Sequence, residues 1–172
     1  MNSRRALAYL LLAAAICALA VHLLAVFGYT PFGGVPLPVL FLVAFPAWLA
    51  LILHANARSA RAGGTRANPF NWFAVIPPWG RVLFGIVFIY AGANFAGFFV
   101  ATGGGTPEQQ ADGRYILTDH GRFIRTLDAR GVHDFEAWEV RLFSGHILPF
   151  LVLPGLYFLF APSLGDGERK QS

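Results

Sequence analysis

The sequence predicts an all-α membrane protein: a four-helix transmembrane bundle with a small extracytoplasmic β-hairpin and an amphipathic helix between the third and fourth spans. Its 172 residues are 56% hydrophobic and 13% charged, and the mean hydropathy is +0.55. Soluble domains carry about 25% charged residues, so the bilayer is the better solvent for this chain. The apolar residues form four long stretches, and the charged residues lie between and beyond them.

Each apolar stretch is long enough to cross a hydrocarbon core about 30 Å thick, which takes about 20 helical residues. The predicted spans are residues 6–27, 36–55, 82–101 and 142–161, all within one membrane domain covering 1–172. Pro46, Pro149 and Pro154 interrupt the second and fourth spans, which membrane helices tolerate when neighbours satisfy the freed carbonyls. The first span follows two arginines as a signal peptide does, but its uncharged run is longer, so we expect it to be retained.

The distribution of charge predicts the orientation. Eight basic and two acidic residues flank the first span, separate spans two and three, or end the chain, a balance of +6. The segment 102–141 has five arginines and seven acids, a balance of −2. The positive-inside rule therefore puts both termini in the cytoplasm and 102–141 outside, as a cap. The pI of 9.7 then needs no nucleic-acid partner, and the Ala- and Arg-rich composition suggests the inner membrane of a bacterium.

The cap is predicted to contain two strands and a helix. Arg114–Thr118 and Arg122–Leu127 have strand character, and Asp119-His120-Gly121 between them supplies the turn. The Gly-rich residues 102–107 are expected to be a linker. Asp128 is suited to cap a helix, although we expect Gly131 to delay its start to near His133. This amphipathic helix should continue into the fourth span.

Two other features concern the membrane segments. Residues 68–79 are aromatic and bounded by prolines, which predicts a short segment on the inner membrane surface. Small residues recur along the first and third spans, as in close helix contacts, and favour an intramolecular bundle over a homodimer. Asn94 is expected to form a hydrogen bond with a neighbouring helix, and Tyr90 shares its face.

Two classes of membrane function are disfavoured. No predicted span has Asp, Glu, Lys or Arg in its interior, whereas proton-coupled pumps normally need an ionisable group there. Thiol–disulfide exchange needs a pair of cysteines, and Cys17 is alone.

The histidines are the main chemical lead. His22 and His146 are predicted at similar depths near the outer surface, below His120. A cluster of the three would be able to hold a metal, a haem or a polar headgroup, or to act in acid–base catalysis. However, the sequence contains no metal-ligand spacing such as His-x-x-x-His, and each histidine is equally compatible with a structural role. No cofactor is therefore predicted, and haem or metal remains an alternative.

The outer end of the fourth span is the best single place for a site, because Arg141, Ser144 and His146 meet there. Arg141 is expected either to pair with an acid such as Glu139 or to hold a lipid phosphate. Together with His22 and His120, these residues are the candidates for ligand or headgroup binding. No catalytic residue is assigned.

Two functional hypotheses follow, and no segment carries a family-specific motif. The first is a non-enzymatic accessory or interaction protein of the inner membrane that acts through its outer cap. The alternative is a membrane enzyme, or a haem-, metal- or lipid-binding protein, with a site at the outer interface. The expected partners are the lipid bilayer and either a protein or a second copy of the chain.

Overall fold

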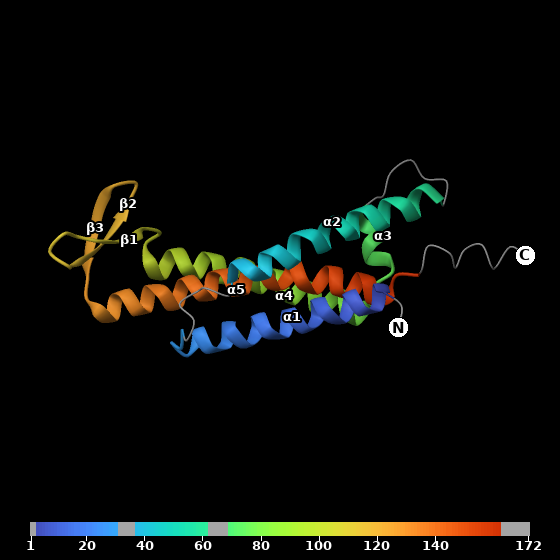
Figure 1. Ribbon diagram of the computed structural model, residues 1–172, viewed down its shortest axis with the longest axis horizontal. Helices are drawn as coiled ribbons and strands as arrows, with labels where there is room; N and C mark the ends of the chain where they lie inside the picture. Colours follow the sequence, from blue (N-terminus) through green and yellow to red (C-terminus); the bar gives the residue numbers. More distant parts are fainter. Residues whose placement is uncertain (1–2, 31–36, 62–68, 163–172) are drawn as a thin grey trace, which may run out of the picture.

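The computed structural model describes residues 3–30, 37–61 and 69–162. Within these ranges the chain is mostly helical, with a small antiparallel sheet between its last two long helices (Figure 1). In chain order the elements are α1 (Ser3–Val26), α2 (Leu37–Arg61), α3 (Pro69–Ala74), α4 (Pro78–Thr102), β1 (Thr106–Gln109), β2 (Tyr115–Asp119), β3 (Arg122–Leu127) and α5 (Ala129–Phe160). Three basic residues used to predict the orientation, Arg66, Arg169 and Lys170, lie outside the described ranges.

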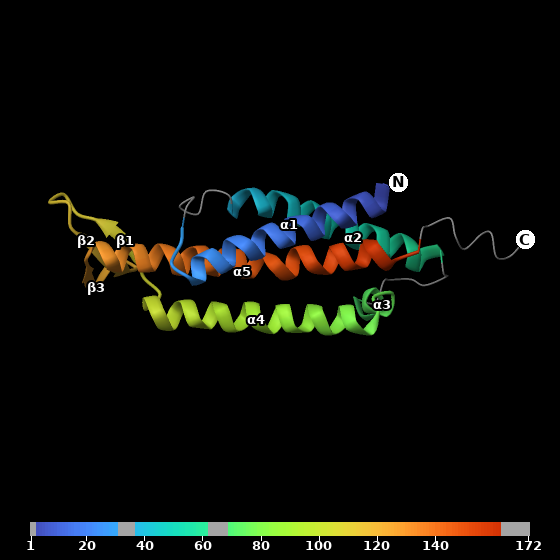
Figure 2. The ribbon, with the colours of Figure 1, turned by 90° about the horizontal axis from the view of Figure 1, so that it is seen from below.

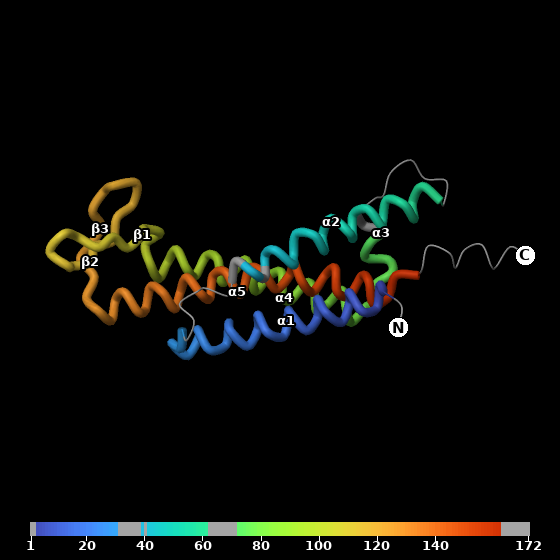
Figure 3. The backbone as a smooth tube through the Cα atoms, viewed as in Figure 1, coloured from blue at the N-terminus to red at the C-terminus, as the bar shows by residue number. Residues whose placement is uncertain are grey.

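Four helices correspond to the four predicted spans. α1, α2, α4 and α5 are each long and apolar enough to cross a membrane, which implies contact with a lipid bilayer. The amphipathic segment and the fourth span form one helix, α5, which runs unbroken in Figure 3. The expected delay of its start to near His133 is wrong. Asp128 caps the helix by accepting the backbone N–H of Gly131 at 2.7 Å, so α5 already begins at Ala129.

The helix α5 is the centre of the fold. In Figure 2 it lies between α4 on one side and α1 and α2 on the other. In an 18-residue apolar stretch of α5, 72% of the residues are buried, against 17–28% in the corresponding stretches of the other three long helices. Every residue from Leu151 to Phe158 is buried. α1, α2 and α4 thus pack around α5, and their remaining faces carry most of the exposed apolar side chains.

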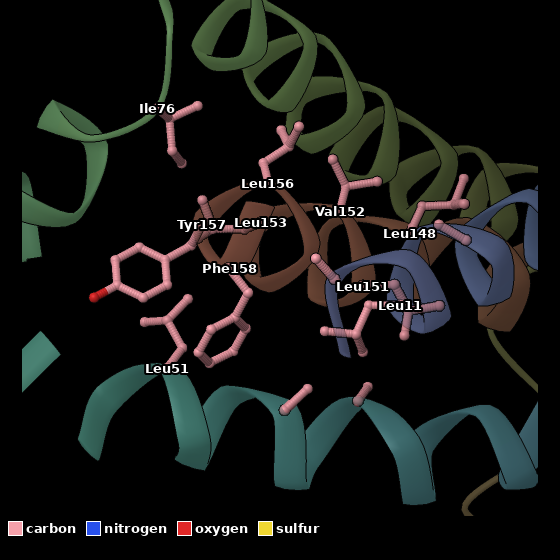
Figure 4. Close-up of a cluster of buried hydrophobic side chains, with 14 of the residues drawn as sticks. Leu11, Leu51, Ile76, Leu148, Leu151, Val152, Leu153, Leu156, Tyr157 and Phe158 are labelled. Atoms are coloured by element: carbon pink, nitrogen blue, oxygen red, sulfur yellow. The ribbon is translucent and has the colours of Figure 1, made fainter. Parts of the chain in front are cut away.

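The main apolar core lies along the C-terminal half of α5. Figure 4 shows Leu148, Leu151 and Leu156 of α5 among side chains from the surrounding elements, including Leu11 of α1 and Leu51 of α2. Glycine allows α1 to approach closely, because a Cβ at Gly155 would lie 2.9 Å from Leu12 Cδ2. The small residues predicted to pack in the first and third spans do not serve this contact: Ala13 and Ala20 are exposed, and a Cβ at Gly85 or Gly92 would meet nothing within 4 Å.

Side chains from all three surrounding helices donate hydrogen bonds to carbonyls of α5 or its C-cap. Arg4 of α1 donates to Ala161 O, Trp48 of α2 to Phe150 O at 2.9 Å, and Asn94 of α4 to Arg141 O at 2.8 Å. The Trp48 contact has a specific cause. An α-helical carbonyl accepts from the residue four positions later, and for Phe150 that residue is Pro154, which has no N–H. The indole of α2 thus satisfies a carbonyl that proline leaves free.

The cap contains three strands in the order β1-β2-β3, all antiparallel. The predicted hairpin is confirmed as β2 and β3. The expectation of a linker up to residue 107 is wrong, because β1 begins at Thr106 and pairs with β2 from Thr106–Thr118 to Gln109–Tyr115. Both turn residues between β2 and β3, His120 and Gly121, have positive φ, as a tight hairpin turn requires.

A second apolar cluster joins the sheet to the helices. Phe98 of α4 and Phe135 of α5 pack with Leu117 of β2 and Leu127 at the end of β3. All four side chains are buried. A two- or three-stranded sheet is marginal in water without such support, so the cap is held to the ends of α4 and α5 by these contacts.

We expect Trp48→Phe to lower the free energy of unfolding by about 1 kcal/mol, because Phe150 O loses its donor. In the Pro154→Ala background, Trp48→Phe should lower the free energy of unfolding clearly less, because the restored backbone N–H of residue 154 donates to Phe150 O. The measurement is a double-mutant cycle from denaturation in mixed micelles. Trp72→Phe is the matched control, since Trp72 Nε1 is buried without a partner in the described structure. Equal losses in both backgrounds would contradict the assignment.

Candidate functional site

A polar network links α1, α4 and α5, about one turn before the end of α1 and near the middle of α4 and α5; its histidine and serine are buried, and its tyrosine, Tyr90, is 41% exposed. His22 of α1 lies with Nδ1 3.0 Å from Ser144 Oγ of α5 and Nε2 2.5 Å from the Tyr90 hydroxyl of α4. His22 is 1% exposed and Ser144 is fully buried. The imidazole therefore connects α1 to both neighbours, and the Tyr90 ring meets it edge-on.

The direction of each hydrogen bond follows from Ser144. Its hydroxyl donates to Val140 O at 2.6 Å, one turn earlier in α5. Ser144 Oγ is then the acceptor for His22, so Nδ1 carries the proton and Nε2 accepts from the Tyr90 hydroxyl. The serine proton is already bound to a backbone carbonyl, and His22 Nδ1 is not a free base. In this arrangement the pair is a structural link and not an activated nucleophile.

Gly145 makes room for the network. A Cβ at this position would lie 2.7 Å from Asn94 Nδ2 and 3.2 Å from His22 Cε1. Asn94 uses this space to donate to Arg141 O. Its Oδ1 is buried and has no partner among the described residues. Within the sequence Ser144-Gly145-His146, the first two residues thus belong to the polar network: Ser144 through its hydrogen bond with His22, and Gly145 through the space it leaves.

The other candidate histidines lie elsewhere. His146 is two residues from Ser144, hence at the depth expected, but it packs on Phe95 with ring centroids 5.2 Å apart. His120 is at the β2–β3 turn with a side chain 97% exposed, and its nearest charged partner is Asp119 at 3.7 Å. The structure therefore does not bring His22, His120 and His146 together. Within the described ranges, no three His, Cys, Asp or Glu side chains are grouped so as to hold a metal ion.

An open cleft of about 710 Å³ lies beyond the network, where the helices meet the cap. Its walls come from the C-terminal ends of α1, α4 and β3 and from the first turns of α5. The charged residues that line it are Arg125, Asp128, Asp134 and Arg141. Phe135 and Trp138 are the largest apolar side chains in its walls.

Arg141 joins the cleft to the network. Its carbonyl accepts from Asn94, and its guanidinium carbon lies 3.7 Å from the ring centroid of Trp138. The Arg141 Nε atom is buried without a hydrogen-bond partner among the described residues. The expected pairing with an acid such as Glu139 is not formed in the described structure, where the arginine stacks on an aromatic ring instead.

Sequence reasoning placed Arg141, Ser144 and His22 near one another but did not assign two of the side chains that contact them. Tyr90 was placed on the face of Asn94 from its one-turn spacing in an otherwise apolar span, but its hydrogen bond with His22 was not predicted. Trp138 was assigned only to an apolar helix face. Its role beneath a guanidinium depends on the side-chain direction of Arg141, which the spacing does not reveal.

Comparisons with protein-family models, with curated proteins and with solved structures find no match to this chain.

We expect Gly145→Ala to lower the free energy of unfolding by about 1–3 kcal/mol, because the added methyl group displaces the Asn94 amide and the His22 ring. Gly92→Ala is the control, since a Cβ there meets nothing within 4 Å. Both variants are compared by thermal denaturation in detergent. An equally stable Gly145→Ala protein would argue against this packing.

Tyr90→Phe should cost about 0.6–1 kcal/mol, because His22 Nε2 is left without a donor in a low-dielectric interior. Tyr9→Phe makes the same chemical change on α1; Tyr9 is 53% exposed and Tyr90 41%, but only the Tyr90 hydroxyl is hydrogen-bonded to His22. The two variants are compared in the same denaturation series. A loss of equal size in both would mean that the Tyr90 hydroxyl does not stabilise the helix contact.

Proposed function

We propose that the protein is a non-enzymatic accessory protein of the inner membrane that binds a partner protein through its outer cap. Both termini lie in the cytoplasm in this proposal, and residues 102–141 lie outside. The charge balance of +6 against −2 supports this orientation. The four long apolar helices support a multi-pass arrangement.

The observation that carries the proposal is an exposed strip on β3. Five consecutive residues, Arg122 to Thr126, are exposed, and they include Phe123 at 59% and Ile124 at 39%. Apart from residues close to the end of α1, these are the exposed large hydrophobic side chains outside the long helices in the described ranges. Phe123 pairs with Thr118, whereas Ile124 lies beside Leu117, so the two side chains are on opposite faces of the sheet. Phe123 is the more exposed of the two and is therefore the apolar side chain that we expect a partner to contact.

The geometry of the strip favours a partner that contacts its side chains over one that adds a strand to its backbone. β3 is an edge strand, but its pairing with β2 shifts register between Leu117 and Thr118, so the strand carries a bulge. Bulges blunt an edge against the addition of another strand. A partner would therefore contact the side chains of the strip more readily than its backbone.

Charge indicates the chemistry of the partner. Arg114 is paired with Asp112 at 2.6 Å, and this guanidinium holds the pKa of the Asp112 carboxyl below its ordinary value. Arg122 and Arg125 flank the two apolar residues and have no carboxylate within salt-bridge distance among the described residues. A partner segment that combines acidic and apolar side chains fits this strip.

The buried network supports a binding role over a catalytic one. Of the three histidines that sequence analysis offered for acid–base chemistry, His22 is buried and hydrogen-bonded to Ser144, His146 packs on Phe95, and His120 lies apart from both at the β2–β3 turn. The accessible polar groups lie instead on the cap and in the cleft, where they are free to contact a ligand or a partner.

The test is a photo-crosslinking amino acid placed at position 123 of the full-length protein in its native membrane. We expect a crosslinked protein product that Arg122→Glu reduces about fivefold or more, as a loss of about 1 kcal/mol would. Arg114→Glu is the control, because it makes the same charge change in the β1–β2 connection of the cap, outside the strip. A crosslinker at position 100, which is 87% exposed on α4, reports contacts of the membrane face.

Two results would contradict the proposal. One is a product at position 123 that consists of lipid alone. The other is a protein product that the two charge reversals reduce equally.

A further inference from the structure

The cleft of about 710 Å³ is a second feature of the cap and does not include the exposed residues Phe123 and Ile124. It opens where α1 and α4, on opposite sides of α5 in Figure 2, reach their cap-side ends. Its volume lies within the range of small-molecule sites, about 300–1,000 Å³. Because the long helices are those suited to cross the membrane, the cleft lies at the level where they leave the hydrocarbon.

Arg141 supplies a cation at the membrane side of the cleft. Helical side chains lean toward the N-terminus, and the guanidinium accordingly lies over Trp138, one turn before its own Cα. Its Nε is buried and has no partner in the described structure. A buried guanidinium N–H without an acceptor is costly, so an anion in the cleft would satisfy it. Arg125 lines the cleft from β3 and provides a second guanidinium.

Asp134 supplies an anion farther from the membrane. It is one helical turn beyond Trp138, about 6 Å along the axis. Its neighbours Arg130 and His133 are each 3.9 Å away, and its side chain is 63% exposed. The other lining acid, Asp128, already accepts the backbone N–H of Gly131 as the helix cap. Asp134 is thus the acid able to accept a new donor.

The geometry points to a site for the zwitterionic headgroup of a membrane phospholipid, with its phosphate at Arg141 and Arg125 and its ammonium group at Asp134. The order of charges fits phosphoethanolamine, since the phosphate of such a lipid is nearer the acyl chains and the amine is farther out. Arginine forks match phosphate oxygens, and a primary ammonium offers N–H donors to a carboxylate. The acyl chains would lie along the apolar ends of α1 and α4, beside Val26 and Ala101.

Because the cleft has both positive and negative side chains, it should distinguish this headgroup from others. The lining residues contain two arginines and two aspartates, so their formal charges cancel. Phosphatidylglycerol would satisfy the arginines but offer no donor to Asp134, which would keep only Arg130 and His133, each 3.9 Å away. Phosphatidylcholine has no N–H donor for the carboxylate. The cleft should therefore rank phosphatidylethanolamine above both.

The test is native mass spectrometry of the full-length protein in detergent, titrated separately with these three lipids. We expect Arg141→Gln to weaken phosphatidylethanolamine binding about tenfold, the equivalent of about 1.4 kcal/mol. Asp134→Asn should weaken phosphatidylethanolamine binding and leave phosphatidylglycerol binding unchanged or stronger. Arg122→Gln is the control, because Arg122 lies on the cap outside the cleft. Arg141→Lys keeps the charge, so it serves as a second variant should Arg141→Gln fail to fold.

A water-soluble competitor distinguishes the source of the headgroup. Glycerophosphoethanolamine should displace the lipid only at far higher concentration, because it lacks the acyl chains. Competition at the same concentration as the lipid would overturn a membrane source. Equal binding of all three lipids, or equal binding by wild type, Arg141→Gln and Arg141→Lys, would overturn the site itself. Arg125 belongs to both the cleft and the β3 strip, so the test is read from variants of Arg141 and Asp134, which line the cleft and lie outside the strip.

Discussion

The burial of α5 among the other three long helices is the constraint on which the rest of the structure depends. A helix surrounded by apolar side chains has no water with which to satisfy a free carbonyl. Trp48 meets this need at Phe150, whose carbonyl Pro154 leaves free, while Arg4 and Asn94 donate to the carbonyls of Ala161 and Arg141. Hydrogen bonds depend on orientation and apolar contacts do not, so these polar contacts fix how each helix is rotated against α5.

The same principle explains why the polar network and the cleft belong together. Asn94 holds the carbonyl of Arg141, and the next turn of α5 carries Ser144, which receives His22. The side chain of Arg141 extends the other way, over Trp138 and into the cleft. One residue thus has its backbone in the buried network and its charge in the cleft, so the interior determines the position of the accessible cation.

Much of the fold was predictable from the sequence because hydrophobic length and local turn chemistry are local signals. The four spans, the β2–β3 hairpin and the continuity of α5 were of this kind. β1 was missed because its residues, Thr106–Gln109, include a proline and an acid and become a strand only by pairing with β2. The prediction that the histidines form a cluster was wrong for another reason. A span that is apolar all round does not reveal its rotation, so depth alone was unable to tell that His22 faces inward toward Ser144 while His146 packs on Phe95.

The shared position of Arg141 has a thermodynamic consequence. A ligand that binds the guanidinium only when it is stacked on Trp138 stabilises the α5 conformation that also presents the Arg141 carbonyl to Asn94. Binding in the cleft and the contact between α4 and α5 are therefore linked, and each favours the other by the same free energy. Because the His22–Tyr90 bond joins α1 to α4 beside this contact, the linkage extends to all three helices around the cleft. Lipid bound in the cleft would in this way be coupled to the packing of the helix core.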